Sequence, residues 1–585
     1  MKKVYNIFLF LATWGLFFSL TSCQKYFLEK KIGSDLTVDS VFATQQKSLA
    51  AIAQAYSISL VSGITVLGWD GDRTYGLKGG TLSHLSGELN AVKFNWEDAW
   101  KIQHNGMTSN DGSGTPLSSD GFNANYRAIR QCYLVIENIH KVNDMSEAAK
   151  NQVRAEMKTL IAYRYLEMMK RYGGVPVFEG LLSTDMELML PRATVEDVLK
   201  HIVKLCDEAL PDLPAIQEAS MKGRVNKGIA MAIKAEAYMF IARPLFNSAT
   251  PYMNFGENNN LICLGRTDAS YWQKAIDANL EVLSWANSNG HSIINTGKPF
   301  EDYATAVATP GNPEVLLAYK SQNNDGMANY NPRTQGGGAN AMSYIQLTQY
   351  HKTDGSNQTW TNETWAPYTE YTAKVNELEP RFKASATVAG QDSWNNPGSY
   401  PWSTAALSGA SDWDGRAGTE GAGRRVKFWY LAGPRNWFEF PIYRLAETYL
   451  NLAEAYNEIN NPAEAHQYLN VIRKRAGLPN VTESSQARLR EIIQREWAVE
   501  FYEENHRYFD VKHWKLADLG NGIIGGSKKA VVFQYKNGSN GTFAWDYSSY
   551  AVKEAYVGFW APSQHLDPFP IAEVNKGYIK QNPGY

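Results

Sequence analysis

A helix-pair pattern that recurs along the chain is the feature that most constrains its fold. In the clearest copy, bulky and small residues stand at helical spacing in two predicted helices that a proline follows: Tyr449, Leu452, Ala453, Tyr456, Ala465, Leu469 and Pro479. The small residues matter because two helices can pack closely only where no large side chain lies between them. The pattern therefore predicts a mainly α fold of stacked helix pairs, and it favours a core role for these residues.

The same pattern recurs towards the N-terminus. The tetrapeptide Ala-Glu-Ala-Tyr at 453–456 has a duplicate in a helix predicted over 227–247, whose partner is expected over 268–286. The spacing is that of tetratricopeptide (TPR) helix pairs. Two more pairs are expected, one from 153–172 with 194–210 and one from 39–61 with 123–142. Helical periodicity covers roughly 38–290 and 440–518, and the Gly-, Asn-, Ser- and Trp-rich region between them predicts loops.

The charge balance argues against one class of partner. The 585 residues include 57 Lys and Arg against 59 Asp and Glu, so the net charge is −2. A nucleic-acid-binding protein normally carries a basic excess that displaces counterions from phosphates, so we expect no nucleic acid partner. The 33 Tyr and 17 Trp outnumber the 23 Phe, which favours surfaces that are flat and apolar yet tolerate water.

The N-terminus has the pattern of an export signal. Residues 1–3 are Met-Lys-Lys, and 4–20 form an apolar stretch that is short for a membrane span. The following Leu-Thr-Ser-Cys sequence resembles a bacterial lipobox, so residues 1–22 are predicted to be a lipoprotein signal peptide and Cys23 the lipidation site. The alternative is an ordinary secretory signal with an incidental cysteine. No other stretch is long and apolar enough to span a bilayer.

The remaining cysteines predict neither disulfides nor a metal site. Cys132, Cys206 and Cys263 are an odd number at wide separations, without the spacing of metal ligands. Cys132 and Cys206 lie among apolar helical positions, where a free cysteine behaves as a small hydrophobe.

Signals for catalysis are weak. Gly520, Gly522 and Gly525 match the letters of a dinucleotide-binding fingerprint, but they follow a predicted helix and open no βαβ unit, so we interpret them as a loop. The chain has no H-E-x-x-H, G-x-S-x-G or Walker A motif, and its ten His do not cluster at ligand spacing. We therefore expect no enzyme activity, no catalytic residue, no cofactor and no metal site, with a calcium in some surface loop left open.

Several further motifs follow one another in a fixed order: FLE at 27–29, RAE at 154–156, RYGGVP at 171–176, GRVNKG at 223–228, PIYRLAE at 441–447, LNVIRKRAGL at 469–478, REWAVEF at 495–501, HRYFDVKHWK at 506–515 and QNPGY at 581–585. Together with the lipobox, they resemble the SusD/RagB family of outer-membrane glycan- and nutrient-binding lipoproteins of Bacteroidetes. The resemblance covers nearly the whole chain.

The resemblance implies both a fold and a role. The fold is an α-superhelix of TPR-like helix pairs packed against a loop-rich irregular half, with a SusD-like N-terminal region over 23–240, a SusD/RagB C-terminal region over 268–585 and a loop-rich insertion at about 300–430. The role is that of a lipid-anchored protein on the surface of the outer membrane. It would capture oligosaccharide and deliver it to a SusC-like TonB-dependent transporter. Ligand contacts of the family lie in variable loops, so only Cys23 carries over as a site residue.

Glycan binding points to particular loops. A sugar ring offers a C–H face that stacks on aromatic rings, and hydroxyls that need amide, guanidinium or carboxylate partners. Trp-rich loops with Asn, Asp and Arg supply both, at 68–75 with 94–100 and again at 340–413. The predicted ligand-binding residues from these loops are Trp69, Arg73, Trp96, Trp360 and Trp365. The alternative for any one of them is that it fills the gap between helices and loops.

Two other functions stay open. A lipid-anchored glycoside hydrolase needs only two carboxylates about 5 to 9.5 Å apart, which no sequence pattern excludes. A TPR-type scaffold would bind a protein helix in place of a sugar. The cargo itself stays open between glycan, glycopeptide and peptide.

Overall fold

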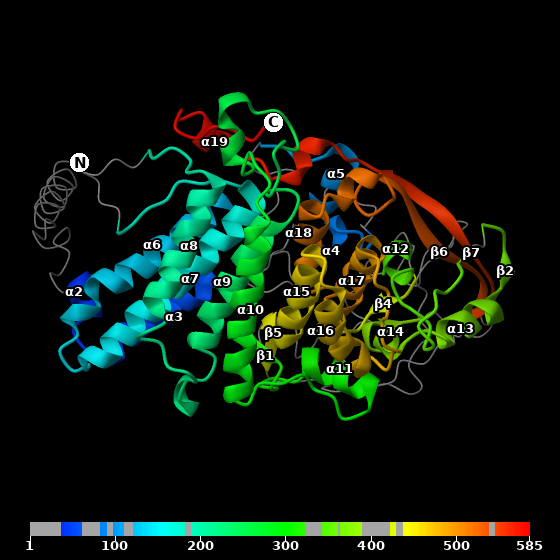
Figure 1. Cartoon of the computed structure of the whole chain (residues 1–585), viewed down its shortest axis with the longest axis horizontal. Helices are drawn as coiled ribbons and strands as arrows, with labels where there is room; N and C mark the ends of the chain where they lie inside the picture. The colour runs from blue at the N-terminus through cyan, green and yellow to red at the C-terminus, as the bar shows by residue number, and fades with distance from the viewer. Residues whose placement is uncertain are drawn as a thin grey trace, which may run out of the picture.

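The computed structural model describes residues 37–60, 82–90, 98–109, 121–181, 189–322, 342–360, 363–388, 422–428, 437–537 and 545–585. Figure 1 shows an N-terminal helix block beside a second helix block, with a β-ribbon at the far end of the second. The predicted fold class is confirmed: the chain is mainly α, and its helix pairs pack against a more irregular half.

The N-terminal block consists of the helix pairs that the sequence predicts. α3 packs on α6, α7 on α8, and α9 on α10. α9 ends five residues earlier than expected, because Pro244 follows and the residue before a proline disfavours helical geometry. The helices of this block are α2 (Val38–Val41), α3 (Gln45–Ser59), α6 (Phe122–Asn138), α7 (Glu147–Tyr172), α8 (Val195–Ala209), α9 (Lys227–Ala242) and α10 (Ser270–Ser288). Two short helices that precede α6 in the sequence, α4 (Leu82–Leu85) and α5 (Asp98–Asn105), lie instead beside α18 and β7 in the other part of the molecule (Figure 1).

Side-chain caps fix where three of these helices begin. The side-chain oxygens of Ser146, Thr194 and Asn226 accept hydrogen bonds from backbone N–H groups three residues further on, at 3.2, 3.0 and 3.2 Å. Two glycines end α7. Gly173 has a φ of 77°, and a Cβ on Gly174 would overlap the carbonyl oxygen of a neighbouring segment. The glycine pair in the RYGGVP motif is therefore a requirement of backbone geometry.

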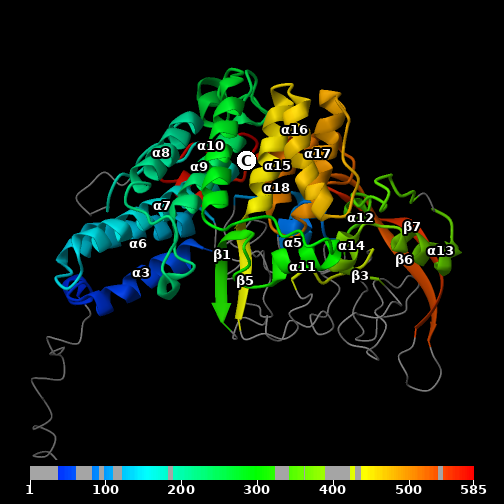
Figure 2. The ribbon, with the colours of Figure 1, turned by 60° about the horizontal axis from the view of Figure 1, so that its bottom comes forward.

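The second helix block carries the clearest copy of the repeat. It consists of α15 (Leu445–Glu458), α16 (Pro462–Arg475), α17 (Gln486–Glu500) and α18 (His506–His513). α15 packs on α16 as predicted, and the small residues Ala453 and Ala465 are fully buried. α15 also packs on α10, which joins the two blocks into one stack (Figure 2).

The strands were not predicted. β5 (Trp437–Arg444) occupies the start of the range expected to be helical, and it pairs with β1 (Val315–Gln322). β6 (Gly526–Asn537) and β7 (Trp545–Gly558) form a long antiparallel ribbon that β2 (Ala366–Pro367) extends in the order β2–β7–β6. β3 (Ala386–Thr387) pairs with β4 (Arg424–Arg425). Both faces of β6 are covered, so its sequence lacks the alternation that marks a half-buried strand.

Two of the hydrophobic clusters in the described segments are large and serve as cores. The main core runs through both helix blocks. A second core, under the β6–β7 ribbon, contains Tyr350, Trp360, Tyr371, Phe533 and Tyr550. The short helices of this half are α11 (Pro299–Ala308), α12 (Tyr344–Leu347), α13 (Tyr368–Asn376) and α14 (Pro380–Ser385), and α19 (Ile571–Val574) lies near the C-terminus.

A group of buried ion pairs, the central ion cluster, ties the irregular half to the helices. Arg444 Nη1 lies 2.8 Å from Glu314 Oε1 and 2.9 Å from Glu500 Oε1, and its Nε lies 2.7 Å from Glu504 Oε2. Burial disfavours the charge of Glu500, but its arginine partners outweigh that effect and hold its pKa far below the usual range. The cluster consists of Glu314, Arg381, Arg444, Arg475, Glu496, Glu500 and Glu504, all of them buried.

The C-terminal segment closes the N-terminal block. Arg171 at the end of α7 forms a buried ion pair with Asp567, with 2.9 Å between Nη1 and Oδ2. Arg192 Nη1 donates to the carbonyl of Lys580 at 2.8 Å, and Asn582 Nδ2 donates to the carbonyl of Tyr172 at 3.2 Å. The last residues of the chain therefore complete the environment of its first helix pairs.

Candidate functional site

The structure describes two of the predicted site residues. Cys23, Trp69, Arg73 and Trp96 lie outside the described residues. Trp360 and Trp365, five positions apart, differ sharply in their surroundings: Trp360 is 4% exposed and Trp365 is 39% exposed.

The surface around Trp365, called the Trp365 platform below, combines an aromatic ring with charged groups. Trp365 directly precedes β2, which pairs with β7. Nζ of Lys553 on β7 lies 6.0 Å from the centroid of the Trp365 ring and donates to the backbone carbonyl of Glu363. The carboxylate of Glu363 lies 3.2 Å from Nζ of Lys529 on β6. An exposed ring beside ammonium and carboxylate groups offers a sugar both a stacking face and polar partners.

Trp360 belongs to the second core. Its ring centroid lies 5.9 Å from that of Tyr371, and its carbonyl accepts a hydrogen bond from the Tyr344 hydroxyl at 2.8 Å. A ring that is 4% exposed presents almost no face to a ligand. This burial favours the alternative reading of Trp360, that it fills space behind the loops, over a role as a sugar platform.

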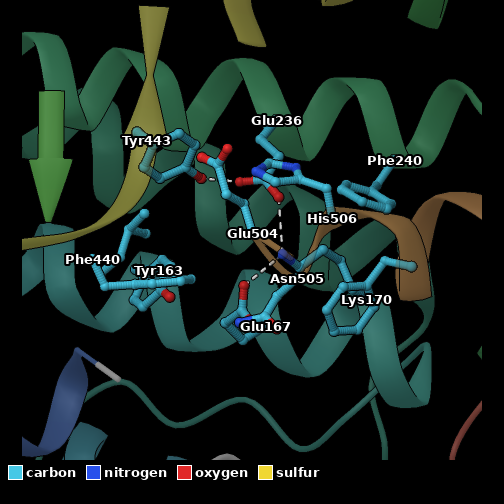
Figure 3. A pocket seen from close by; sticks show the side chains of 12 residues that line it. Tyr163, Glu167, Lys170, Glu236, Phe240, Phe440, Tyr443, Glu504, Asn505 and His506 are labelled. Carbon is cyan, nitrogen blue, oxygen red and sulfur yellow. Dashed lines mark hydrogen bonds and ion pairs between the residues drawn. The ribbon is translucent and has the colours of Figure 1, made fainter. Parts of the chain in front are cut away.

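A buried polar cavity lies where α7, α9, β5 and the start of α18 meet (Figure 3). Lys170 stands between Glu167 and Glu236, with N–O distances of 2.5 and 2.9 Å, and the Tyr443 hydroxyl donates to Glu236. Burial alone would lower the pKa of Lys170, but the charges of Glu167 and Glu236 outweigh the effect of burial and raise that pKa above the ordinary value. The free volume of ≈ 30 Å³ suits a water molecule and is too small for a sugar ring.

A second pocket, of ≈ 250 Å³, lies between α10, α15, α17 and α18 and bears on the hydrolase alternative. Two of its carboxylates stand one turn apart on α15. Glu454 accepts from Nε and Nη2 of Arg243 at 2.9 and 2.8 Å, and Glu458 accepts from the same atoms of Arg490 at 2.6 and 2.7 Å. A catalytic acid and a nucleophile each need a carboxylate oxygen that can reach the substrate. Here both oxygens of each carboxylate are held by an arginine, so the pocket fits a structural role.

Other predicted features can be placed as well. Among the described residues, no group of three or more His, Cys, Asp or Glu side chains could hold a metal ion. Within the same segments, no helix combines the length and the apolar character that crossing a membrane requires. Cys132, Cys206 and Cys263 are buried and free. The residues from Gly520 to Gly525 form a loop ahead of β6, as interpreted from the sequence.

The sequence alone does not indicate the lysines of the Trp365 platform. Lys529 and Lys553 both come from the β6–β7 ribbon, on neighbouring strands. Their place beside Trp365 follows from the pairing of β2 with β7, and no local pattern around Trp365 signals that pairing.

Comparison with known proteins decides the family. A family model described as "SusD family" matches residues 308–585, and another described as "Starch-binding associating with outer membrane" matches residues 27–239. The chain belongs to the SusD/RagB family. It is 23% identical over 547 residues to a SusD-like protein of Formosa agariphila, which covers 88% of this chain and 90% of that protein.

Solved structures of SusD-like proteins share the fold. One, from Bacteroides fragilis, superposes with a TM-score of 0.73 at 23% identity, over 94% of this chain and 98% of that one. Another, described as a SusD-like carbohydrate binding protein from Bacteroides fragilis, has a TM-score of 0.69 at 18% identity, over 92% of this chain and 99% of that one. The SusD-like architecture therefore extends over nearly the whole length.

Proposed function

We propose that this SusD/RagB protein is a lipid-anchored lipoprotein of the cell surface that binds oligosaccharide and passes it unchanged to a SusC-like TonB-dependent transporter. The observation that carries the proposal is the match of SusD-type models to both parts of the chain, one of them described as starch-binding and associating with the outer membrane. A structural neighbour described as carbohydrate binding supports it. The Trp365 platform supplies the ring and the charged groups that sugar recognition needs.

Calorimetry with the mature chain tests the binding step. The protein carrying Cys23→Ala, with the signal peptide removed, is titrated with a panel of oligosaccharides that differ in sugar and linkage. At least one is expected to bind, and Trp365→Ala should weaken that binding at least fivefold, because a stacked ring contributes about 1 kcal/mol or more. Phe559→Ala is the matched control, since Phe559 is also an exposed aromatic residue, at 41%. If the two variants bind equally, the choice of platform is wrong.

The same preparation tests whether the sugar leaves unchanged. Each oligosaccharide that binds is incubated with the protein, and new reducing ends are counted over time. We expect none, because the two carboxylates of the pocket between α10, α15 and α17, Glu454 and Glu458, are each held by an arginine. Steady release at an enzymatic rate would establish the hydrolase alternative instead.

Anchoring and partnership have separate tests. Intact cells are labelled with a fatty acid, and the label is expected on the protein in the outer-membrane fraction but not on the Cys23→Ala variant. Purification from mild detergent should bring down a large β-barrel protein as the stable companion. If the Cys23→Ala variant also takes up the fatty-acid label, Cys23 is not the anchor. If no β-barrel protein purifies together with this protein, the proposed transporter partner is not supported.

A further inference from the structure

An aromatic groove runs along one face of α6, far from the Trp365 platform: Figure 1 shows α6 and β2 at opposite ends of the molecule. The groove lies between α6, the segment 176–180 and the C-terminal turn that includes α19, and it encloses ≈ 310 Å³. That volume is in the range of small-molecule sites and suits a sugar unit. Five rings line it: Tyr126 and Tyr578 are partly exposed, whereas Phe122, Tyr133 and Phe178 are buried and form the base of its wall.

The polar ends of these rings are already engaged. The hydroxyls of Tyr126 and Tyr133 donate to the backbone carbonyls of Pro176 and Phe178, at 2.6 and 3.0 Å. The hydroxyl of Tyr578 donates to Glu573 Oε2 at 2.5 Å. These bonds fix the rings in place, so what the tyrosines add to the groove is chiefly ring surface, the kind of surface on which the C–H face of a sugar stacks.

Two arginines give the groove its charge. Arg127 and Arg130 stand one turn apart on α6, both line the groove and both are exposed. Neither guanidinium has a hydrogen-bond or ion-pair partner within the segments that the structure describes. This contrasts with the arginines of the central ion cluster and of the pocket on α15, which are all paired.

The carboxylates near the groove do not neutralise this pair. Glu573 is occupied by Lys576, with 2.9 Å between Oε2 and Nζ, and by the Tyr578 hydroxyl. Glu179 and Glu208, whose charges also act on Tyr133, are paired with Lys204 and Lys158, each at 2.8 Å. Glu137 acts on Tyr133 as well, and its Oε1 would lie 3.7 Å from a Cβ on Gly180, so one carboxylate stands against the two arginines. The groove therefore keeps a positive excess beside its aromatic walls.

We propose that this groove is a second saccharide site, which binds an acidic sugar unit bearing a carboxylate or a sulfate. The partly exposed rings of Tyr126 and Tyr578 would take the apolar face of the sugar. The planar guanidiniums of Arg127 and Arg130 would pair with the anionic group, for which arginine is well suited. The assignment rests on the proposed function of saccharide binding, and it adds the substrate class.

The test compares acidic and neutral ligands on the full mature chain carrying Cys23→Ala. The probes are oligogalacturonate, a sulfated carrageenan oligosaccharide and a neutral maltooligosaccharide, each titrated by calorimetry. At least one acidic probe should bind, and Arg127→Gln with Arg130→Gln should weaken it at least tenfold, because hydrogen bonds between charged groups are the strong ones. Binding should also weaken as salt is raised. Neutral probes should not respond to the double substitution.

Two controls separate charge and ring effects from general damage. Arg488→Gln with Lys474→Gln removes the same charge from exposed positions on α17 and α16, and should leave the affinity for acidic probes within about twofold. Tyr578→Phe keeps the ring and should retain binding, whereas Tyr578→Ala should lose it. Circular dichroism should show that every variant is folded.

The outcomes separate this inference from the proposed function. If neutral probes bind at the Trp365 platform while acidic probes either fail to bind or bind the arginine double variant unchanged, the inference is overturned and the proposed function stands. Tight binding of an acidic, tyrosine-containing peptide in the groove, with no saccharide bound there, also overturns it. If no saccharide of either kind binds, the proposed function fails and the second site fails with it.

Discussion

Replacing Glu500 with Gln is expected to destabilise the protein strongly. The Glu500 carboxylate is fully buried and pairs with Arg381, Arg444 and Arg475. Gln keeps the size of the side chain and removes its charge. Breaking one side of a buried ion pair costs about 3–5 kcal/mol, because it leaves an uncompensated charge. Since Arg381 and Arg444 keep other carboxylate partners, we expect the lower end, about 3 kcal/mol in the free energy of unfolding.

Urea unfolding followed by tryptophan fluorescence measures this loss. The control is Glu491→Gln, which removes the same charge from α17 where Glu491 and Arg488 are 66% and 70% exposed. An exposed pair contributes about 0–1 kcal/mol, so the control should change little. The pKa of Glu500 is depressed in the folded chain, so its stabilisation is present above the ordinary value of 4.5 and is lost as the pH falls below it. Equal losses in the two variants at neutral pH would refute this reasoning.

Burial raises the pKa of Glu88 from 4.5 to about 7, so the contribution of Glu88 to the stability of the folded chain falls as the pH rises through that range. Glu88→Gln should therefore flatten the dependence of the free energy of unfolding on pH, as urea unfolding can measure. An unchanged pH dependence would contradict this. Gly228→Ala should lower the free energy of unfolding by about 1–3 kcal/mol, because a Cβ there would overlap the ring of Trp285. An unchanged midpoint of urea unfolding would show that the ring can move aside. Burial raises the pKa of Cys132 to about 12 and that of Cys206 further, so neither should react with iodoacetamide until urea is added, as mass spectrometry can show; labelling of the folded protein would argue against their burial.

The helix pairs could be predicted because their signal is local. The spacing of Leu452, Ala453 and Tyr456 within one helix already determines which face packs on the next. The strands lack such a signal. β5 was included in a predicted helical range, because a short apolar run fits either structure and its partner β1 lies more than a hundred residues away. Local periodicity carries no information on a pairing of that length.

The candidate site could be predicted by residue type but not by exposure. Trp360 and Trp365 share the same loop-rich sequence context, yet only Trp365 reaches the surface. The difference arises from the second core, which Phe533 and Tyr550 of the ribbon complete around Trp360. The sequence does not indicate a role for Arg127 and Arg130 on α6 for a related reason. Their neighbours Phe178 and Tyr578 come from distant parts of the chain, so only the folded structure shows the groove.

The ion pair between Arg171 and Asp567 has a consequence for the order of events during biosynthesis. The two residues are 396 positions apart, so a chain that emerges N-terminus first contains α7 long before Asp567 is made. Because the pair is buried, the absence of one partner destabilises the folded arrangement. We therefore expect α7 to gain its final stability only after Asp567 has joined it, and a product that ends before Asp567 to be more open to proteases.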